Sequence, residues 1–349
     1  MPKVPLNPQT AEEKLYTKWI VALRKKVIYL AERTENIYKL SHYLNQKDLD
    51  ALGIELSQMD FRTGVPSGAP QFFKPTQNSN WTLKDTKEPP VSLNDELDKI
   101  GFDPLFESPG SDGYQTERAA AVLSVLEKRL HPLREKNHNV CQWEPVQKDC
   151  FMKRVGLHYK HDLWENTIAH QVVGKKKPHL MLFMNTSCSA QEGKLAATEA
   201  FQILRYMLSE MTRQLFADIE SLNKVKWPDS SALQLIFPVL AFSVVEPAHC
   251  RFIQCYFDGK VKIQLSNFEN LDGRQFPDLF ETVIRLCNPV PCGDTMSVTA
   301  AGEENVNPEH LVKHMGALHV RRNEVATVEP VPSALRSERA PIKKCTSIS

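Results

Sequence analysis

The sequence predicts an α/β fold, with an α+β arrangement as the alternative, in which a helical N-terminal part precedes a mixed sheet. Three features predict it. A strand pattern leads through a long amphipathic helix to a second apolar strand, an Asp-Gly turn joins two further strand patterns, and a short amphipathic helix follows them. A strand, a helix and a strand in this order form a β-α-β unit, whose strands are expected to be parallel with a right-handed crossover.

The first feature is the β-α-β unit. Residues 179–184 form a short apolar run that is typical of a buried strand. Ser189 and Glu192 have the spacing of a capping box, in which side chain and backbone bond each other at a helix start, so the helix is expected to begin there. The second strand is expected within 233–247. Pro238 inside it indicates a sheet edge or a bulge, because proline cannot donate to the ladder.

The second feature is a β-hairpin around Asp258 and Gly259, a dipeptide that is typical of two-residue turns. Counting outward from this turn pairs Tyr256 with Val261 and predicts one covered, mainly apolar face and one face in contact with water. The third feature is the closing helix, which is expected over 277–287 and begins with a proline, whose missing N–H is no loss in the first turn.

Further helices are expected before this core. Thr10 and Glu13 form another capping box, which predicts a helix of several turns with a basic face. A short helix is expected within 92–102, and a longer one over 114–136, which Pro132 bends or ends. The predicted regions are a helical N-terminal region (1–61), a Pro/Gly-rich linker (62–113), the α/β core (114–290) and a disordered tail (291–349).

Composition bounds the compartment and the partners. The 349-residue chain has a formal net charge of +1, so no global field attracts nucleic acid or an anionic membrane, and nucleic acid would need local basic patches. The sequence has no apolar run of about 18 residues and no apolar core of a secretion signal near its start. We therefore expect an intracellular protein, in the nucleus or the cytoplasm, with no membrane partner and with its eight cysteines as free thiols.

Several common chemistries lack their motifs. The sequence has no Gly-x4-Gly-Lys-Ser/Thr, no Gly-x-Gly-x-x-Gly after a strand and no Gly-x-Ser-x-Gly. Nucleotide hydrolysis, dinucleotide redox chemistry and the nucleophile elbow of serine hydrolases are therefore not indicated. The basic run 175–177 is either a solvated turn or a phosphate contact. Cys188 is either a buried, inert thiol or a thiol whose pKa is lowered by a helix N-terminus.

One stretch of the chain is rich in possible metal ligands. His158, His161 and Asp162 are the candidates, with His170 and His179 farther along the sequence. Zinc sites usually contain two tight pairs of ligands, and the pair of His158 and His161 has no matching second pair. His161 and Asp162 are adjacent, so in a strand their side chains point to opposite faces. We therefore expect no metal and no small-molecule cofactor.

The order of helices and strands from Thr116 to Cys287 resembles the PD-(D/E)xK nuclease-like fold, particularly its divergent members in filamentous fungi. Such members typically have Glu-x-Lys at the end of the strand before the long helix. Residues 184–186, Met-Asn-Thr, stand at that place in this chain, and only Asp162 maps to the upstream acid. The resemblance therefore implies an inactive relative.

The same resemblance also implies which residues would act if the chain were an active Mg²⁺-dependent nuclease. These are Asp162, Glu192 and Lys194, with Glu199 as another candidate for the second acid. Asp162 and the second acid would have to lie within about 5 Å of each other to hold one Mg²⁺ through their oxygens.

The segment KWPDSSALQLIFPVLAFSVVEP is similar to accessory regulators of fungal mating-type loci, which are named for Pro, Pro and Phe positions. Pro228, Pro238 and Phe242 are the candidate positions in this chain. The resemblance implies a role in sexual development. The alternative is that the prolines punctuate the strand and that the phenylalanine belongs to the core.

We therefore expect a non-catalytic, intracellular binding or regulatory protein with a protein partner. Two alternatives stay open. One is a divergent Mg²⁺-dependent nuclease of the PD-(D/E)xK type. The other is a protein-interaction module that works through residues 92–102 and the basic N-terminal helix.

Overall fold

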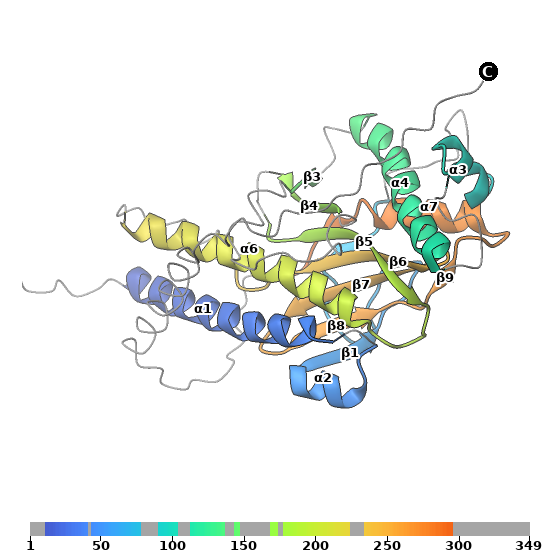
Figure 1. Cartoon of the computed structure of the whole chain (residues 1–349). Helices are drawn as coiled ribbons and strands as arrows, with labels where there is room; N and C mark the ends of the chain where they lie inside the picture. The colour runs from blue at the N-terminus through green and yellow to red at the C-terminus, as the bar shows by residue number, and fades with distance from the viewer. Residues whose placement is uncertain are drawn as a thin grey trace, which may run out of the picture. The chain divides into compact units, whose positions relative to one another are not determined.

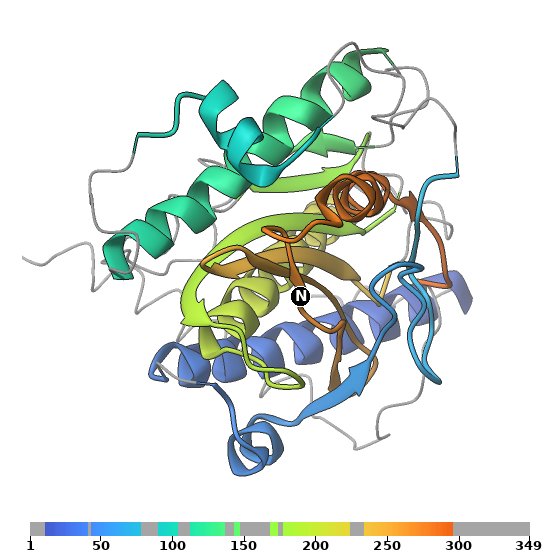
Figure 2. The same cartoon turned by 90° about the vertical axis from the view of Figure 1, so that its right-hand side faces the viewer.

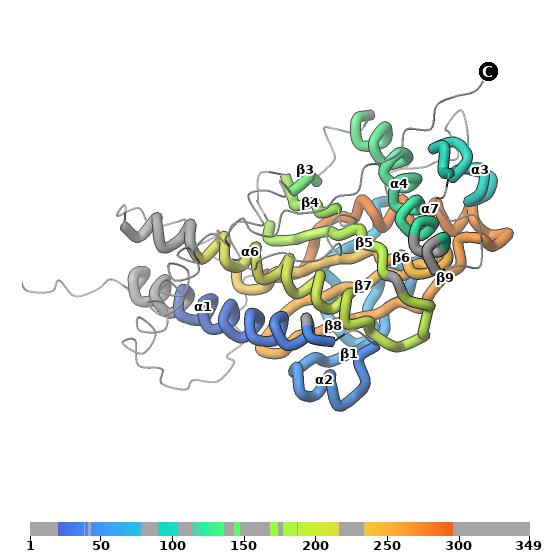
Figure 3. Tube along the Cα trace, in the orientation of Figure 1, coloured from blue at the N-terminus to red at the C-terminus, as the bar shows by residue number. Residues whose placement is uncertain are grey.

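The computed structural model describes the chain in several stretches, which lie within one compact unit from Met1 to Ala301. Figure 3 shows the path of the chain. The described residues are 11–40, 43–77, 90–103, 112–136, 143–146, 168–173, 177–223 and 234–295.

Helices and strands alternate along these residues. The helices are α1 (Ala11–Tyr38), α2 (Gln46–Leu52), α3 (Leu93–Lys99), α4 (Asp112–Lys136), α6 (Ala197–Asn223) and α7 (Phe276–Leu286). The strands are β1 (Ile54–Gln58), β2 (Phe73–Lys74), β3 (Trp143–Pro145), β4 (Ile168–Val172), β5 (Leu180–Ser189), β6 (Val239–Glu246), β7 (His249–Phe257), β8 (Val261–Leu265), β9 (Glu269–Asn270) and β10 (Val290–Pro291). No helix that the structure describes is long and apolar enough to cross a lipid bilayer.

The main sheet contains eight of these strands in a mixed arrangement. Its order is β1-β8-β7-β6-β5-β4-β3, and β9 pairs with β7. Strands β5 and β6 are parallel, as are β1 and β8, whereas the other neighbours are antiparallel. Strands β2 and β10 form a separate antiparallel pair. The predicted α/β fold, with a parallel β5-α6-β6 unit at its centre, is confirmed.

Helices cover both faces of the sheet (Figures 1 and 2). Alternate residues of β5 point to the two faces, as a strand requires. Leu182 and its neighbours on that face pack with α1 and α6, whereas Met181 and Phe183 pack with α3, α4 and α7. The sheet is therefore buried between two apolar clusters. The β7–β8 hairpin was predicted to have one face in contact with water, that of Lys260, Lys262 and Gln264. Lys260 is exposed and Lys262 half-buried, but Gln264 is fully buried, so only the end of that face near the turn meets water.

The N-terminal region and the predicted linker both belong to this unit. Strand β1 lies within 1–61 and extends the sheet beside β8. Phe72 and Phe73, in the predicted linker, are each 2% exposed and pack in the same cluster as α4 and α7. The N-terminal region and the linker therefore have no separate cores of their own, and the boundaries expected after residues 61 and 113 fall within one packed unit. The expected short helix within 92–102 is confirmed by α3, which begins after an N-cap at Ser92.

The β5-α6 connection differs from its prediction. Strand β5 continues to Ser189, which pairs with Glu246 on β6, and α6 does not begin until Ala197. The capping box predicted at Ser189 and Glu192 is therefore wrong. Glu199 performs the corresponding role at the true helix start, where its Oε2 accepts the N–H of Ala196 at 3.0 Å.

The β7–β8 hairpin confirms the predicted turn but shifts its register by one residue. Phe257, rather than Tyr256, pairs with Val261, so the loop contains Lys260 as well as Asp258 and Gly259. Gly259 has a φ of 120°, which favours glycine. A one-residue shift exchanges the two faces of a strand. The predicted cross-strand pairs are therefore wrong, although the strands are correctly placed.

Two prolines also differ from expectation. Pro132 lies inside α4, which continues to Lys136, so the proline does not end the helix. Leu130 and Leu133, on either side of it, are buried against the sheet and stabilise the helix there. Pro238 directly precedes β6, and its carbonyl accepts the N–H of Leu180 on β5 at 2.9 Å. Its missing N–H is therefore not required by the β6 ladder, and no edge or bulge is needed at this position.

Candidate functional site

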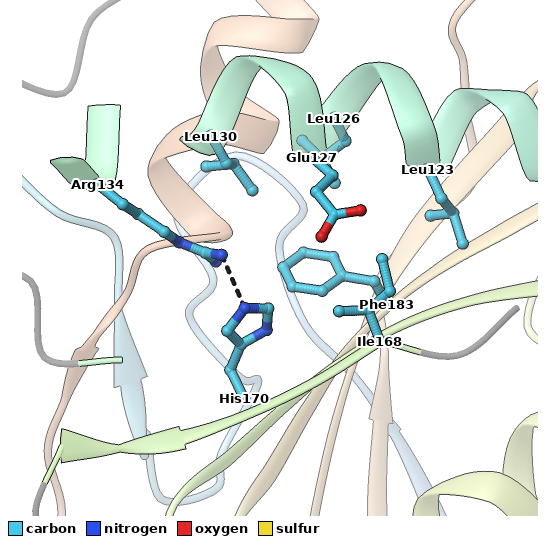
Figure 4. Close-up of a pocket in the computed structure, with 8 residues that line it drawn as sticks. All are labelled: Leu123, Leu126, Glu127, Leu130, Arg134, Ile168, His170 and Phe183. Atoms are coloured by element: carbon cyan, nitrogen blue, oxygen red, sulfur yellow. Dashed lines mark hydrogen bonds between the residues drawn. The ribbon is translucent and has the colours of Figure 1, made fainter. Parts of the chain in front are cut away.

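A pocket lies between α4 and the strands β4 and β5 (Figure 4). Its cavity volume is about 10 Å³, roughly the space that a single water molecule needs. The spacing of one helix face places side chains from α4 on one wall, and the alternation of a strand places Ile168 and His170 together on the other. The lining residues are Leu123, Leu126, Glu127, Leu130, Arg134, Ile168, His170 and Phe183.

Arg134 and His170 form the polar end of this pocket. Arg134 Nη1 lies 2.7 Å from His170 Nε2. A guanidinium is always protonated in proteins, so Nη1 donates and Nε2 accepts. Burial, together with the nearby charge of Arg134, lowers the pKa of His170 to about 3, so the ring is neutral at pH 7. A neutral imidazole has one N–H, and His170 must therefore carry it on Nδ1.

His170 Nδ1 is a buried polar atom for which the structure shows no hydrogen-bond partner among the described residues. The His170 residue is only 5% exposed. Figure 4 shows Nδ1 on the side of the ring that faces Ile168 and Phe183, away from Arg134. Phe183 lies edge-to-face with the ring at 5.5 Å between centroids. The Nδ1–H of His170 thus faces the apolar wall, whereas Arg134 contacts the opposite side of the ring.

A second polar group lies at the junction between β5 and α6. Glu199 and Arg251 are both fully buried and form an ion pair. Arg251 Nε donates to Glu199 Oε1 at 3.1 Å, Nη2 donates to Oε2, and Nη1 donates to the Lys194 carbonyl at 2.7 Å. The guanidinium carbon also lies 4.3 Å from the centre of the Phe268 ring. The charge and the donors of Arg251 are thus satisfied by the chain itself.

Cys188 lies beside this ion pair, in β5 and not at a helix N-terminus. Its Sγ lies 3.1 Å from Tyr43 Oη, and that hydroxyl donates to the Ser189 carbonyl at 2.6 Å. Burial raises the pKa of Cys188 to about 11, although the hydrogen bond to Tyr43 opposes it. A thiol with such a pKa is protonated at neutral pH and is a poor nucleophile. The interpretation of Cys188 as an inert thiol is the one that this geometry supports.

The residues proposed for a nuclease site do not form a metal site within the described residues. Glu192 accepts the N–H of Phe268 at 3.1 Å, and Lys194 Nζ donates to Gln191 Oε1 at 3.0 Å. Glu199 is occupied by Arg251. Where the structure describes the chain, no three His, Cys, Asp or Glu side chains are grouped as metal ligands.

The structure describes only some of the other residues that the sequence suggested for metal binding, phosphate contact or the Pro-Pro-Phe pattern. His158, His161, Asp162 and Pro228 lie outside the described residues, as do Lys175 and Lys176. Lys177 donates to the Pro291 carbonyl at 2.8 Å, so it has a structural contact. Phe242 is 2% exposed and lies in the apolar cluster beneath α4 and α7.

His179 is buried in a different place from His170, on the side of β2 and β10. The residue is 1% exposed, and its ring lies 5.2 Å from that of Phe73. Its Nε2 lies 2.9 Å from the Cys292 carbonyl, which can only accept, so Nε2 donates. Burial lowers the pKa of His179 to about 4. The histidine, just before β5, therefore joins the main sheet to the residue that follows β10 as a neutral ring.

This arrangement predicts an acid sensitivity that depends on His179. In the unfolded chain the histidine has a pKa near 6.5, so between about pH 6.5 and pH 4 it is protonated there but stays neutral in the native state. The free energy of unfolding therefore falls as the pH decreases from about 6.5 to about 4. His179→Gln keeps a donor for Cys292 but does not titrate. Urea unfolding at several pH values gives the free energy of unfolding as a function of pH. Its slope should be steeper for the wild type than for His179→Gln by up to about 1.4 kcal/mol per pH unit. Parallel slopes would contradict the assignment.

No protein-family model, curated protein or solved structure matches this chain, so no relative assigns a role to these residues.

Proposed function

We propose that the chain is a non-catalytic binding or regulatory protein that acts inside the cell. The observation that carries the proposal is the buried pair of Glu199 and Arg251. A metal-dependent nuclease needs carboxylates that are free to hold Mg²⁺ at the end of the strand that precedes the long helix. At this junction Arg251 neutralises Glu199 and occupies both of its oxygens. The carboxylate therefore serves the fold.

The second candidate is a divergent Mg²⁺-dependent nuclease. One observation favours it, namely that the long helix α6 is followed by the apolar strand β6, because the resemblance to the PD-(D/E)xK fold rests on this order. The loop between β5 and α6 carries Glu192 and Lys194, and both side chains are exposed. Asp162 would have to supply a further ligand.

A cleavage assay separates these two functions. Purified full-length protein is incubated with single- and double-stranded DNA and RNA in the presence of Mg²⁺ or Mn²⁺. We expect no cleavage above that of Asp162→Asn and Glu192→Gln, because the charge at the junction is already balanced without a cation. Glu135→Gln, at an acid on α4 whose side chain is 71% exposed, is the matched control. Metal-dependent cleavage that both site variants lose and the control keeps would establish the nuclease instead.

The third interpretation, an interaction module built on residues 92–102 and the N-terminal helix, finds less support. The apolar side of α3 is turned inward, since Leu93 and Leu97 are 1% and 3% exposed and pack in the core. Helix α1 packs along α6, and Lys26 on it donates to the Leu235 carbonyl at 3.0 Å. A partner would therefore meet only the outer sides of these helices.

A narrower form of the proposal places the protein in the nucleus with a protein partner and a role in sexual development. It rests on the resemblance carried by Pro228, Pro238 and Phe242. Of these, Pro238 accepts a hydrogen bond from β5 and Phe242 fills the core, so both have structural roles as well. Imaging of a tagged chain tests this form, and exclusion from the nucleus would contradict it.

A further inference from the structure

We draw no further inference here: the strongest candidate, the buried side-chain cluster of Ser243 on β6 and Arg251 on β7 beside Glu199 at the start of α6, belongs to the ion pair already described, and nothing in the part of the chain that the structure describes shows what the unpartnered hydroxyl of Ser243 would bind.

Discussion

Replacing Glu199 with alanine is expected to destabilise the folded chain by about 3–5 kcal/mol, because it leaves the charge of Arg251 buried without a partner. Both side chains are 0% exposed, so water cannot replace the lost carboxylate without opening the structure. The variant also loses the acceptor for the Ala196 N–H at the start of α6. The measurement is urea unfolding followed by far-ultraviolet circular dichroism.

Two further variants test whether the effect arises from the unpaired charge. The double variant Glu199→Met with Arg251→Met removes both charges and should recover most of the loss, since apolar replacements of buried ion pairs are often close to neutral. Glu192→Ala, at an exposed acid on the loop before α6, should change stability by less than about 0.5 kcal/mol. If Glu199→Ala lowers the free energy of unfolding by less than about 1 kcal/mol, the ion pair with Arg251 does not hold this carboxylate in place. Glu199 would then again be a candidate metal ligand.

The β-α-β unit could be predicted from sequence because its evidence is local. Residues 180–184 are all apolar and all buried within β5, so the apolar run by itself marks the strand in the sequence. The following helix has a regular apolar face that packs on the sheet and on α1. Hydrophobic period and length are enough to recognise such elements.

The helix start and the hairpin register were wrong for a common physical reason. Each depended on a single local motif, whereas the structure chooses between alternatives by pairing and burial. Ser189 pairs with β6 and therefore cannot cap a helix. The hairpin includes Lys260 in its loop because this register places Val261 and Phe257 in the α1–α6 cluster and Lys262 beside Glu55. Strand β1 escaped prediction because IELSQ is short and pairs with residues two hundred positions away.

The two buried polar pairs, Arg134–His170 and Glu199–Arg251, could be predicted from the sequence only in part. His170 stood out as a possible metal ligand, but its partner Arg134 lies on a helix 36 residues earlier, and only the fold brings them together. Arg251 has a recognisable signal, since it is the charged residue inside an otherwise buried strand. A buried arginine requires an acid, and the first turn of α6 contains Glu199. The sequence does not show which of the nearby acids is the partner.

Phe242→Ala is expected to cost about 3–5 kcal/mol of folding free energy, as is usual for large cavities in a well-packed core. Phe242 lies at the centre of β6, is 2% exposed, and stands directly opposite Phe252 on β7. The two ring centroids are 5.2 Å apart, and the ring centroid of Phe61 also lies 5.2 Å from that of Phe252. Truncation therefore opens a cavity that neighbouring rings cannot fill without moving the strands. Chemical denaturation measures the loss.

A double-mutant cycle decides whether Phe242 acts through this packing. The coupling between Phe242→Ala and Phe252→Ala should be about 0.5–1.5 kcal/mol, the range for aromatic pairs in contact. Phe242→Leu keeps most of the volume and should cost clearly less than alanine does. A small stability loss with zero coupling would mean that the core does not need this ring. The residue would then be better explained by recognition, as the resemblance to the Pro-Pro-Phe regulators implies, than by the fold.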